Sequence, residues 1–215
     1  MSTKFLLVRH GETFSSRERR FAGSTDTELT DDGRAQAEAL ARRLRQVRVD
    51  VLYSSPLSRC RQTAEAITHV TGRKPTVDDR IRECHFGEWE DLTVTEIMDR
   101  RRDEFMHWLS DETVAPAGGE SWAQVGERLR DWFEDAGRRY EDRTVLAITH
   151  GGPILWLARH VTHAPYQAMV AFEIDTCSIT VIQSRRGLWR LRHLNDTSHI
   201  RDPLLEGPPP KPMPP

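Results

Sequence analysis

The stretch "KFLLVRHGET", Lys4–Thr13, joins a short apolar run directly to a cation, an imidazole and a glycine. The apolar run Phe5–Val8 is typical of a strand that is buried on both faces. Arg9 and His10 follow at once, at the point where such a strand ends. Because ligands in open α/β sheets bind beyond the carboxyl ends of the strands, the stretch predicts a functional site at the end of a buried strand.

Two further strand-like runs lead to residues of the same kind. The run "VDVLYSS" (residues 49–55) is followed by Arg59, early in the next helical pattern, and "TVLAITHGG" (residues 144–152) contains His150 at its end. The carboxyl ends of parallel strands meet at one edge of a sheet. We therefore expect these side chains to converge with His10 on one site.

Helical patterns separate the strand-like runs. They cover residues 29–47, 55–72, 121–140 and 153–161. The second helix is expected to begin with Ser55 as N-cap and Pro56 at its first position, and to end at Gly72. The third opens with a capping box formed by Ser121 and Gln124.

Two more strands are expected at Phe172–Ile182 and Trp189–Leu194. Repeated strand–helix units predict the α/β class, with a single three-layer α/β/α domain around a mostly parallel central sheet. The domain is expected to cover residues 1–202. Residues 203–215 end in "GPPPKPMPP" and are expected to form a Pro-rich, disordered tail.

The composition excludes several function classes. The chain has 215 residues and a net charge of −2, so no basic field favours nucleic acid or an anionic membrane as partner. No apolar run approaches the roughly 20 residues of a membrane span. Cys60, Cys84 and Cys177 are scattered, without a C-x-x-C pair, which argues against a disulfide framework or a zinc site and favours the cytoplasm. No metal-ligand spacing is present, so no metal and no cofactor are expected, and a homodimer stays open.

Five motifs occur in order between Lys4 and His199. They are "LVRHGET", "FAGSTDTELTDDGRAQA", "LYSSPLSRCRQTAE", "IRECHFGEWEDLT" and "AITHGGPI". Together they resemble the motifs of the histidine phosphatase superfamily, the phosphoglycerate mutase-like proteins, and imply a phosphoglycerate mutase-like fold. The sequence departs from that pattern where Ser15 and Ser16 replace Trp-Asn and where Asp91 replaces Gly.

The resemblance implies a catalytic role for His10, Arg9, Arg59, Glu83 and His150. A neutral imidazole avoids the repulsion between a phosphate dianion and an anionic nucleophile, so His10 is the expected nucleophile, with a phosphohistidine intermediate. The planar forks of Arg9 and Arg59 suit the phosphoryl oxygens, and a protonated His150 would add a third cation. Glu83, beside apolar aromatic residues, occupies the position of the family's proton donor.

Further residues are expected to bind substrate. They are Thr13, Ser16, Arg20 and Gly151, together with Arg9, Arg59 and His150. Arg17 and Arg19, in contrast, are expected to be solvated, and Cys60 and Cys84 to be small buried packing residues.

The sequence thus predicts a metal-independent phosphomonoester phosphatase that acts on a small phosphorylated metabolite. The alternative is a phosphoglycerate mutase-type isomerase, which uses the same phosphohistidine. Mutases of this family usually carry a long Arg-rich insertion after the acid motif, whereas only residues 84–116 separate Glu83 from the "AGGES" run here. A non-catalytic binding protein is disfavoured because each expected catalytic residue is present.

Overall fold

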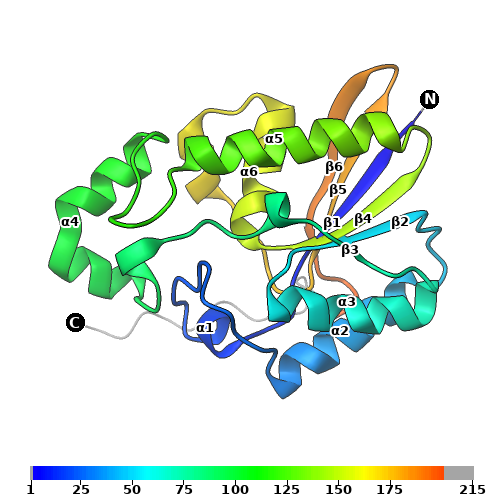
Figure 1. The fold of residues 1–215 in the computed structure, drawn as a ribbon, viewed down its shortest axis with the longest axis horizontal. Coiled ribbons are helices and arrows are strands. Elements are labelled where there is room, and N and C mark those ends of the chain that lie inside the picture. Colours follow the sequence, from blue (N-terminus) through cyan, green and yellow to red (C-terminus); the bar gives the residue numbers. More distant parts are fainter. Residues whose placement is uncertain (1, 201–215) are drawn as a thin grey trace.

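A central sheet of six strands organises the protein, and the computed structural model describes residues 2–200 (Figure 1). The strands are β1 (Lys4–Arg9), β2 (Val51–Ser54), β3 (Thr76–Val77), β4 (Thr144–Thr149), β5 (Ile179–Arg185) and β6 (Leu188–Asp196). Their order in the sheet is β3-β2-β4-β1-β5-β6. The first four in this order run parallel to one another, whereas β5 runs antiparallel to both of its neighbours, β1 and β6. The predicted α/β fold with a mostly parallel sheet is confirmed, with an antiparallel edge.

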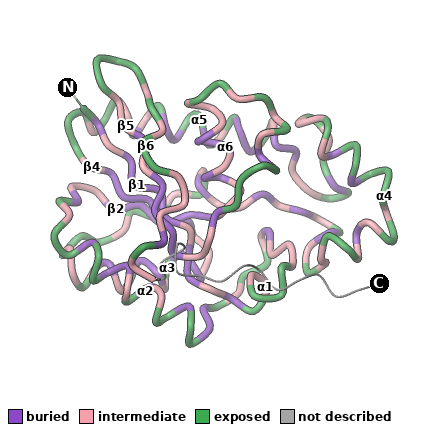
Figure 2. The backbone as a smooth tube through the Cα atoms, turned by 180° about the vertical axis from the view of Figure 1, so that it is seen from behind, coloured by how far each residue is buried: buried purple, intermediate pink, exposed green. Residues whose placement is uncertain are grey.

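Strand β1 lies in the middle of the sheet. It pairs with β4 in parallel, Lys4 opposite Thr144, and with β5 in antiparallel register, Lys4 opposite Gln183. Figure 2 shows that buried residues concentrate along these inner strands. The apolar run that opened the sequence analysis is therefore a strand covered on both faces, as predicted.

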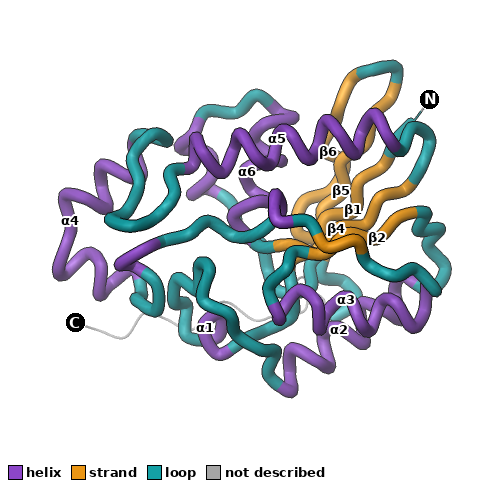
Figure 3. Tube along the Cα trace, viewed as in Figure 1, coloured by secondary structure: helices purple, strands orange, loops and turns teal. Residues whose placement is uncertain are grey.

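Helices cover both faces of the sheet (Figure 3). The α-helices are α1 (Phe14–Arg17), α2 (Asp31–Leu44), α3 (Ser58–Thr71), α4 (Val94–Ser110), α5 (Trp122–Arg139) and α6 (Gly151–Thr162). Three short 3-10 turns complete the list: η1 (Asp79–Ile81), η2 (Gly87–Trp89) and η3 (Tyr166–Ala171). Helices α2 and α3 pack on one face, where Leu6 and Val8 belong to their cluster, and α5 and α6 pack on the other, with Phe5 and Leu7. The alternation along β1 thus divides its side chains between two cores.

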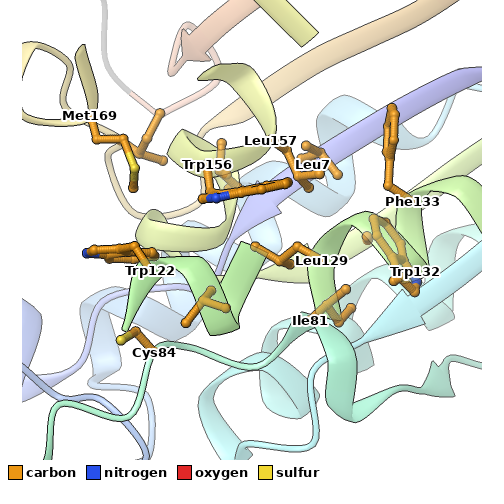
Figure 4. Packing of buried hydrophobic residues seen from close by; sticks show 14 of the residues in the cluster. Leu7, Ile81, Cys84, Trp122, Leu129, Trp132, Phe133, Trp156, Leu157 and Met169 are labelled. Atoms are coloured by element: carbon orange, nitrogen blue, oxygen red, sulfur yellow. The ribbon is translucent and has the colours of Figure 1, made fainter. Parts of the chain in front are cut away.

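Helix α5 supplies much of the larger core. Its inner face presents Trp122, Leu129, Trp132 and Phe133 toward the sheet and toward α6 (Figure 4). The Phe5 ring lies 4.7 Å from the Phe133 ring, centroid to centroid. Burying aromatic side chains of this size dominates the stability of such a core, so α5 is anchored firmly over the sheet.

Most of the predicted helix ends are observed. Ser121 and Gln124 form the predicted capping box of α5, and Gly72 ends α3 at the predicted residue, in the left-handed conformation with φ 66°. Helix α2 is capped by Thr30. The predicted start of α3 is wrong, because the helix begins at Ser58 and has Leu57 at its N-cap. The Ser55 hydroxyl contacts His150 instead.

The predicted strand at Phe172–Ile182 is wrong over its first seven residues. The backbone turns at Cys177, with φ 55°, and the Cys177 N–H donates to the carbonyl oxygens of Arg9 and His10. Strand β5 therefore begins only at Ile179, and the preceding segment closes over the end of β1.

The expected Pro-rich tail and the last residues of the expected domain, 201–215, lie outside the described residues. Among residues 2–200, no helix combines the length and the apolar character that crossing a membrane requires.

Candidate active site

The ends of the parallel strands open into a cavity of about 540 Å³. Arg9 closes β1 and His10 follows it, while Arg59 lies in the first turn of α3. His150 is the N-cap of α6, directly after β4. The rings of His10 and His150 are 5.2 Å apart, centroid to centroid, and Arg59 Nε lies 3.3 Å from His150 Nδ1. Three separate chain segments therefore meet at one point, as the sequence predicted.

The ring orientation of His10 is fixed by its own neighbour. His10 Nδ1 lies 2.7 Å from the carbonyl oxygen of Gly11 and therefore donates its proton to it. This leaves the lone pair on Nε2. Burial, reinforced by the positive charges of Arg59 and Arg9, lowers the pKa of His10 well below its usual range. The site therefore holds His10 as a neutral imidazole with Nε2 available as a nucleophile.

Gly11 is required by the packing behind His10. A Cβ atom at this position would lie 2.5 Å from the carbonyl oxygen of Gly33 in α2. The Gly11 N–H also donates to Thr63 Oγ1 at 3.0 Å. Any side chain here would push the loop away from α2 and α3 and displace His10.

The Arg59 guanidinium is fully buried and held on three sides. Nη1 donates to the Thr25 carbonyl and Nη2 to the Gly23 carbonyl, both at 2.8 Å. Nε donates to His150 Nδ1 at 3.3 Å. None of these partners is a carboxylate, so the guanidinium keeps its full charge for an anionic ligand.

His150 accepts a hydrogen bond rather than supplying a charge. Its Nε2 lies 2.8 Å from Ser55 Oγ, and its Nδ1 accepts from Arg59. Burial, together with Arg59, lowers the pKa of His150 well below its usual range. Both observations favour a neutral His150 that orients Arg59, and a protonated His150 as third cation stays a prediction.

Arg9 has a buried guanidinium nitrogen without a hydrogen-bond partner among the described residues. Nη1 donates to the Ile174 carbonyl at 2.5 Å, whereas the buried Nε has no hydrogen-bond partner among the described residues. Burial lowers the pKa of Arg9, and the nearby carboxylates of Glu83 and Asp175 oppose that change. A buried N–H without a partner is costly, and an anionic ligand in the cavity would satisfy it.

Glu83 lines the same cavity from the segment between η1 and η2. Its Oε1 accepts from the Cys84 N–H at 3.0 Å, and its Oε2 lies 3.4 Å from the Gly152 N–H in α6. Burial raises the pKa of Glu83, against the opposing effect of the Cys84 N–H, Arg59 and Arg9. A carboxyl group whose proton is retained at higher pH suits a proton donor.

Thr13 and Ser16 lie at the cavity wall but bond mainly to each other. Ser16 N donates to Thr13 Oγ1, and Thr13 N donates to Ser16 Oγ, which closes a capping box at the start of α1. Ser16 Oγ also donates to the Thr13 carbonyl at 2.9 Å. The Ser16 hydroxyl is thus committed to the protein, and the structure does not direct it at a ligand.

Arg20 also lines the cavity, while ion pairs occupy its guanidinium. It contacts the carboxylates of Glu18 at 2.8 Å and Glu96 at 3.0 Å. Gly151, the first residue of α6, packs beside Arg9, so its backbone lines the cavity next to the Arg9 guanidinium. Of the residues expected to be solvated, Arg17 pairs with Glu12 and Asp32, whereas exposed Arg19 lines the cavity.

Three supporting residues were not predicted. Ser55 holds His150, Thr63 holds the Gly11 backbone, and Glu90 holds the loop beside Arg59. Ser55 and Thr63 stand within the "SSPLSRCRQTAE" motif and Glu90 within "FGEWED". Their positions within these motifs were the signal in the sequence that could have identified them. Their contacts arise only from the tertiary fold.

The backbone conformation explains why Asp91 can replace the Gly of the family pattern. Asp91 adopts φ 63°, the left-handed conformation that glycine adopts readily and that Asp tolerates better than most residues. Its carbonyl accepts from Arg20 Nη1 at 2.7 Å, and its N–H donates to the Phe21 carbonyl. The substitution therefore preserves the turn that a glycine would make.

All three cysteines are free and buried, as expected for Cys60 and Cys84. Burial raises the pKa of the Cys60 thiol to about 12. Among residues 2–200, no group of three or more His, Cys, Asp or Glu side chains is arranged to hold a metal ion.

The family model described as histidine phosphatase superfamily (branch 1) matches residues 5–197. The chain is 30% identical over 204 residues to phosphoserine phosphatase 1 of Hydrogenobacter thermophilus, covering 94% of this chain and 97% of that protein. It is 33% identical over 169 residues to glucosyl-3-phosphoglycerate phosphatase of Mycolicibacterium vanbaalenii, covering 75% of each.

Solved structures agree with these matches. A mycobacterial glucosyl-3-phosphoglycerate phosphatase in complex with VO3 superposes with a TM-score of 0.82 at 31% identity, over 89% of this chain and 98% of the other. A phosphoserine phosphatase mutant of Entamoeba histolytica in complex with phosphoserine gives 0.84 at 28% identity, over 93% and 100%. The resemblance stated from the motifs is confirmed: this chain belongs to branch 1 of the histidine phosphatase superfamily and is a phosphoric monoester hydrolase.

Proposed function

We propose that the enzyme hydrolyses small phosphate monoesters through a phosphohistidine on His10, without a metal ion. The observation that carries this proposal is the state of His10. Its Nδ1–H is engaged by Gly11, burial lowers the pKa of its ring well below the usual range, and it lines a cavity together with Arg9 and Arg59.

In the first step, His10 Nε2 forms a bond to phosphorus and the ester P–O bond breaks. Arg9 and Arg59 stabilise the charge on the phosphoryl oxygens. Glu83, whose pKa burial raises, gives its proton to the leaving oxygen. The alcohol product then departs.

In the second step, a water molecule attacks phosphorus and the P–N bond breaks, returning the electron pair to His10 Nε2. The Glu83 carboxylate left by the first step accepts the proton of the attacking water. Inorganic phosphate leaves, and Glu83 is again protonated. The two positive guanidinium groups supply the charge stabilisation for which many phosphoryl-transfer enzymes use a metal.

The substrate class we propose is small phosphorylated carboxylic acids. The names of two relatives refer to phosphoserine and glucosyl-3-phosphoglycerate, and both compounds carry a carboxylate near the phosphate. Of the arginines that line the cavity, Arg20 is paired with carboxylates, whereas Arg19 has no ion-pair partner within the described part of the chain. This cation supports a second anionic group on the substrate.

Three free, buried cysteines support a cytoplasmic location.

The test is to trap the phosphorylated enzyme by rapid denaturation at alkaline pH and to map the label. The label should lie on His10, and His10→Ala should lose turnover, while His69→Ala, which alters an exposed histidine of α3, should retain it. Activity should survive EDTA. A label on another residue contradicts the nucleophile, and loss with EDTA that Mg²⁺ restores contradicts metal independence.

The mutase alternative predicts a different fate for the same intermediate. Assaying 3-phosphoglycerate with and without 2,3-bisphosphoglycerate separates the two reactions. We expect phosphate release without interconversion of 2- and 3-phosphoglycerate. Rapid interconversion with little free phosphate would favour transfer back to substrate.

A further inference from the structure

Glu90, in the turn after η2, collects hydrogen bonds from two separate segments. Its carboxylate accepts from Ser24 N at 2.8 Å, from Thr25 N at 3.0 Å and from Thr25 Oγ1 at 2.5 Å. On its other side it contacts His85 Nδ1 at 2.7 Å and Phe86 N at 3.2 Å. Burial alone would raise the pKa of Glu90, but these hydrogen bonds lower it, so the carboxylate is ionised and fully engaged.

The segment that Glu90 holds is also the segment that holds Arg59. The carbonyl oxygens of Gly23 and Thr25 accept from the two terminal nitrogens of the guanidinium, each at 2.8 Å. The N–H groups of Ser24 and Thr25 donate to Glu90 instead. The three residues of this segment therefore stand between a partly buried carboxylate and a buried guanidinium.

The close approach depends on glycine. Gly23 has φ 50°, and a Cβ atom there would lie 2.1 Å from Glu90 Oε1. A side chain at residue 23 would therefore displace the Glu90 carboxylate, so glycine allows the Gly23–Thr25 segment to lie this close to it.

We propose that Glu90 is a positioning residue that fixes the orientation of the Arg59 guanidinium through the Gly23–Thr25 segment. The inference rests on the proposed function, in which Arg59 binds the phosphoryl group. A carboxylate in direct contact with Arg59 would compete with the phosphate for it. Glu90 instead binds the backbone of the Gly23–Thr25 segment and so orients its carbonyl groups, which are neutral. These carbonyl groups orient the Arg59 guanidinium without neutralising its charge.

The test is a double-mutant cycle between Glu90→Gln and Arg59→Lys, measured as kcat/KM on one phosphomonoester. The amide nitrogen that Glu90→Gln introduces cannot accept hydrogen bonds, so the segment loses part of its anchor. With Arg59 present, we expect Glu90→Gln to lower kcat/KM about 10–100-fold, as misplacement of a positioning group does. A lysine has no planar fork to orient, so in the Arg59→Lys enzyme the same substitution should cost less than about 3-fold.

Glu120→Gln is the matched control. Glu120 is also partly buried and collects several donors, from Arg82, Arg128 and His85 N, but the structure gives it no bond to the Gly23–Thr25 segment. Glu120→Gln should change kcat/KM by the same factor in the wild-type enzyme and in the Arg59→Lys enzyme. Should Glu90→Gln fail to fold, Gly23→Ala perturbs the same contact from the other side and carries the same expectation.

An equal loss from Glu90→Gln in both backgrounds, or no loss in either, would overturn the inference. If Arg59→Lys by itself leaves kcat/KM unchanged, the fault lies in the proposed function, because Arg59 then does not hold the phosphoryl group. The two failures are therefore distinguishable in one set of four enzymes.

Discussion

At the scale of single residues, Glu83 combines two demands that oppose each other. In the proposed mechanism it must stay protonated to serve the leaving group, yet two guanidinium groups nearby favour its charged form. Burial is the larger effect, and it raises the pKa of Glu83. At neutral pH the folded enzyme is therefore less stable, because the buried carboxyl group is more costly to ionise than in the unfolded chain.

Glu83→Gln should separate these effects. Because the folded-state pKa lies above the unfolded value, about 4.3, the stability that the carboxyl contributes is complete below that value and is lost as pH rises through the folded pKa. The variant does not titrate there, so its Tm relative to wild type should increase between pH 4 and pH 7.5. Activity on alkyl phosphates should fall about 10²–10⁴-fold, and far less on p-nitrophenyl phosphate.

Thermal unfolding at several pH values and steady-state kinetics on both substrates check this prediction. If the Tm of the variant relative to wild type falls as pH rises, the backbone hydrogen bonds and the charges of Arg59 and Arg9 outweigh burial in setting the pKa of Glu83. Equal kinetic losses on both substrates would assign proton donation to another group.

Arg19 stands in an unfavourable backbone conformation at the cavity. It has φ 56°, directly after the C-cap of α1, where glycine is usual. Arg19→Gly should therefore stabilise the fold by up to about 1 kcal/mol. The same change should raise KM for a phosphorylated carboxylic acid, while KM for a phosphoester without a carboxylate should stay near the wild-type value.

Arg186→Gly is the control for that prediction, because Arg186 also has a left-handed backbone, φ 54°, and lies in the turn between β5 and β6, outside the cavity lining. It should share the gain in Tm without any change in KM. If both variants leave KM unchanged for the carboxylic acid, Arg19 does not bind the carboxylate.

The sequence identified the residues that meet at the cavity better than the residues that hold them in place. Arg9, His10 and His150 directly follow or end apolar runs, so their convergence could be predicted from strand ends alone. The neutral state of His150 could not, because it results from complete burial beside Arg59. The contact between Glu90 and Ser24 could not be predicted either, since 66 residues separate the two partners in the chain.

At the scale of elements, α5 and α6 approach each other closely at Gly126. A Cβ atom on Gly126 would lie 2.6 Å from the indole of Trp156, which is 4% exposed and stacked on His160. The ring has little room to move aside, so the two helices can pack at this distance only with glycine.

Gly126→Ala should accordingly destabilise the protein by about 1–3 kcal/mol, as overpacking does. Gly137→Ala in the same helix is the matched control, because its Cβ atom would lie 3.1 Å from Trp189 and the better helix propensity of alanine offsets the tighter fit. Equilibrium unfolding in urea measures both variants. A Gly126→Ala protein as stable as wild type would show that α6 can shift at little cost.

Element ends were predicted well where a local signal decides them, as at Ser121 and Gly72. They were predicted wrongly where a distant partner decides them. The Ser55 hydroxyl bonds to His150 instead of capping α3, and Cys177 turns the chain back onto the end of β1. An apolar pattern such as that around Ile174 favours a strand, but it cannot report that a carbonyl there accepts from Arg9.

At the scale of the whole molecule, the site exists only when the sheet is assembled. Its residues come from β1, α3, the segment before η2 and the start of α6. No single element contains more than a fragment of the phosphate site, so ligand binding should be linked to global folding.

Inorganic phosphate should therefore raise the free energy of unfolding by about 2.7 kcal/mol at a concentration 100 times its Kd. The measurement is Tm against phosphate concentration, with sodium chloride at matched ionic strength as control. Arg59→Lys should shift the curve to higher phosphate concentrations. A Tm that responds equally to both salts would mean that the anion does not bind this site.

The position of β1 also governs how the chain must fold as it is synthesised. Of the six strands it is the first to be made, whereas its two neighbours in the sheet, β4 and β5, are the fourth and fifth. Thr144, the partner of Lys4 in β4, follows 140 residues later. At ribosomal rates of about 5–20 residues per second, the interval between synthesis of Lys4 and Thr144 is about 7–28 s. During that interval the apolar run Phe5–Val8 lacks β4 and β5, the strands with which it pairs in the folded protein. We therefore expect the nascent chain to bind chaperones that recognise short apolar segments.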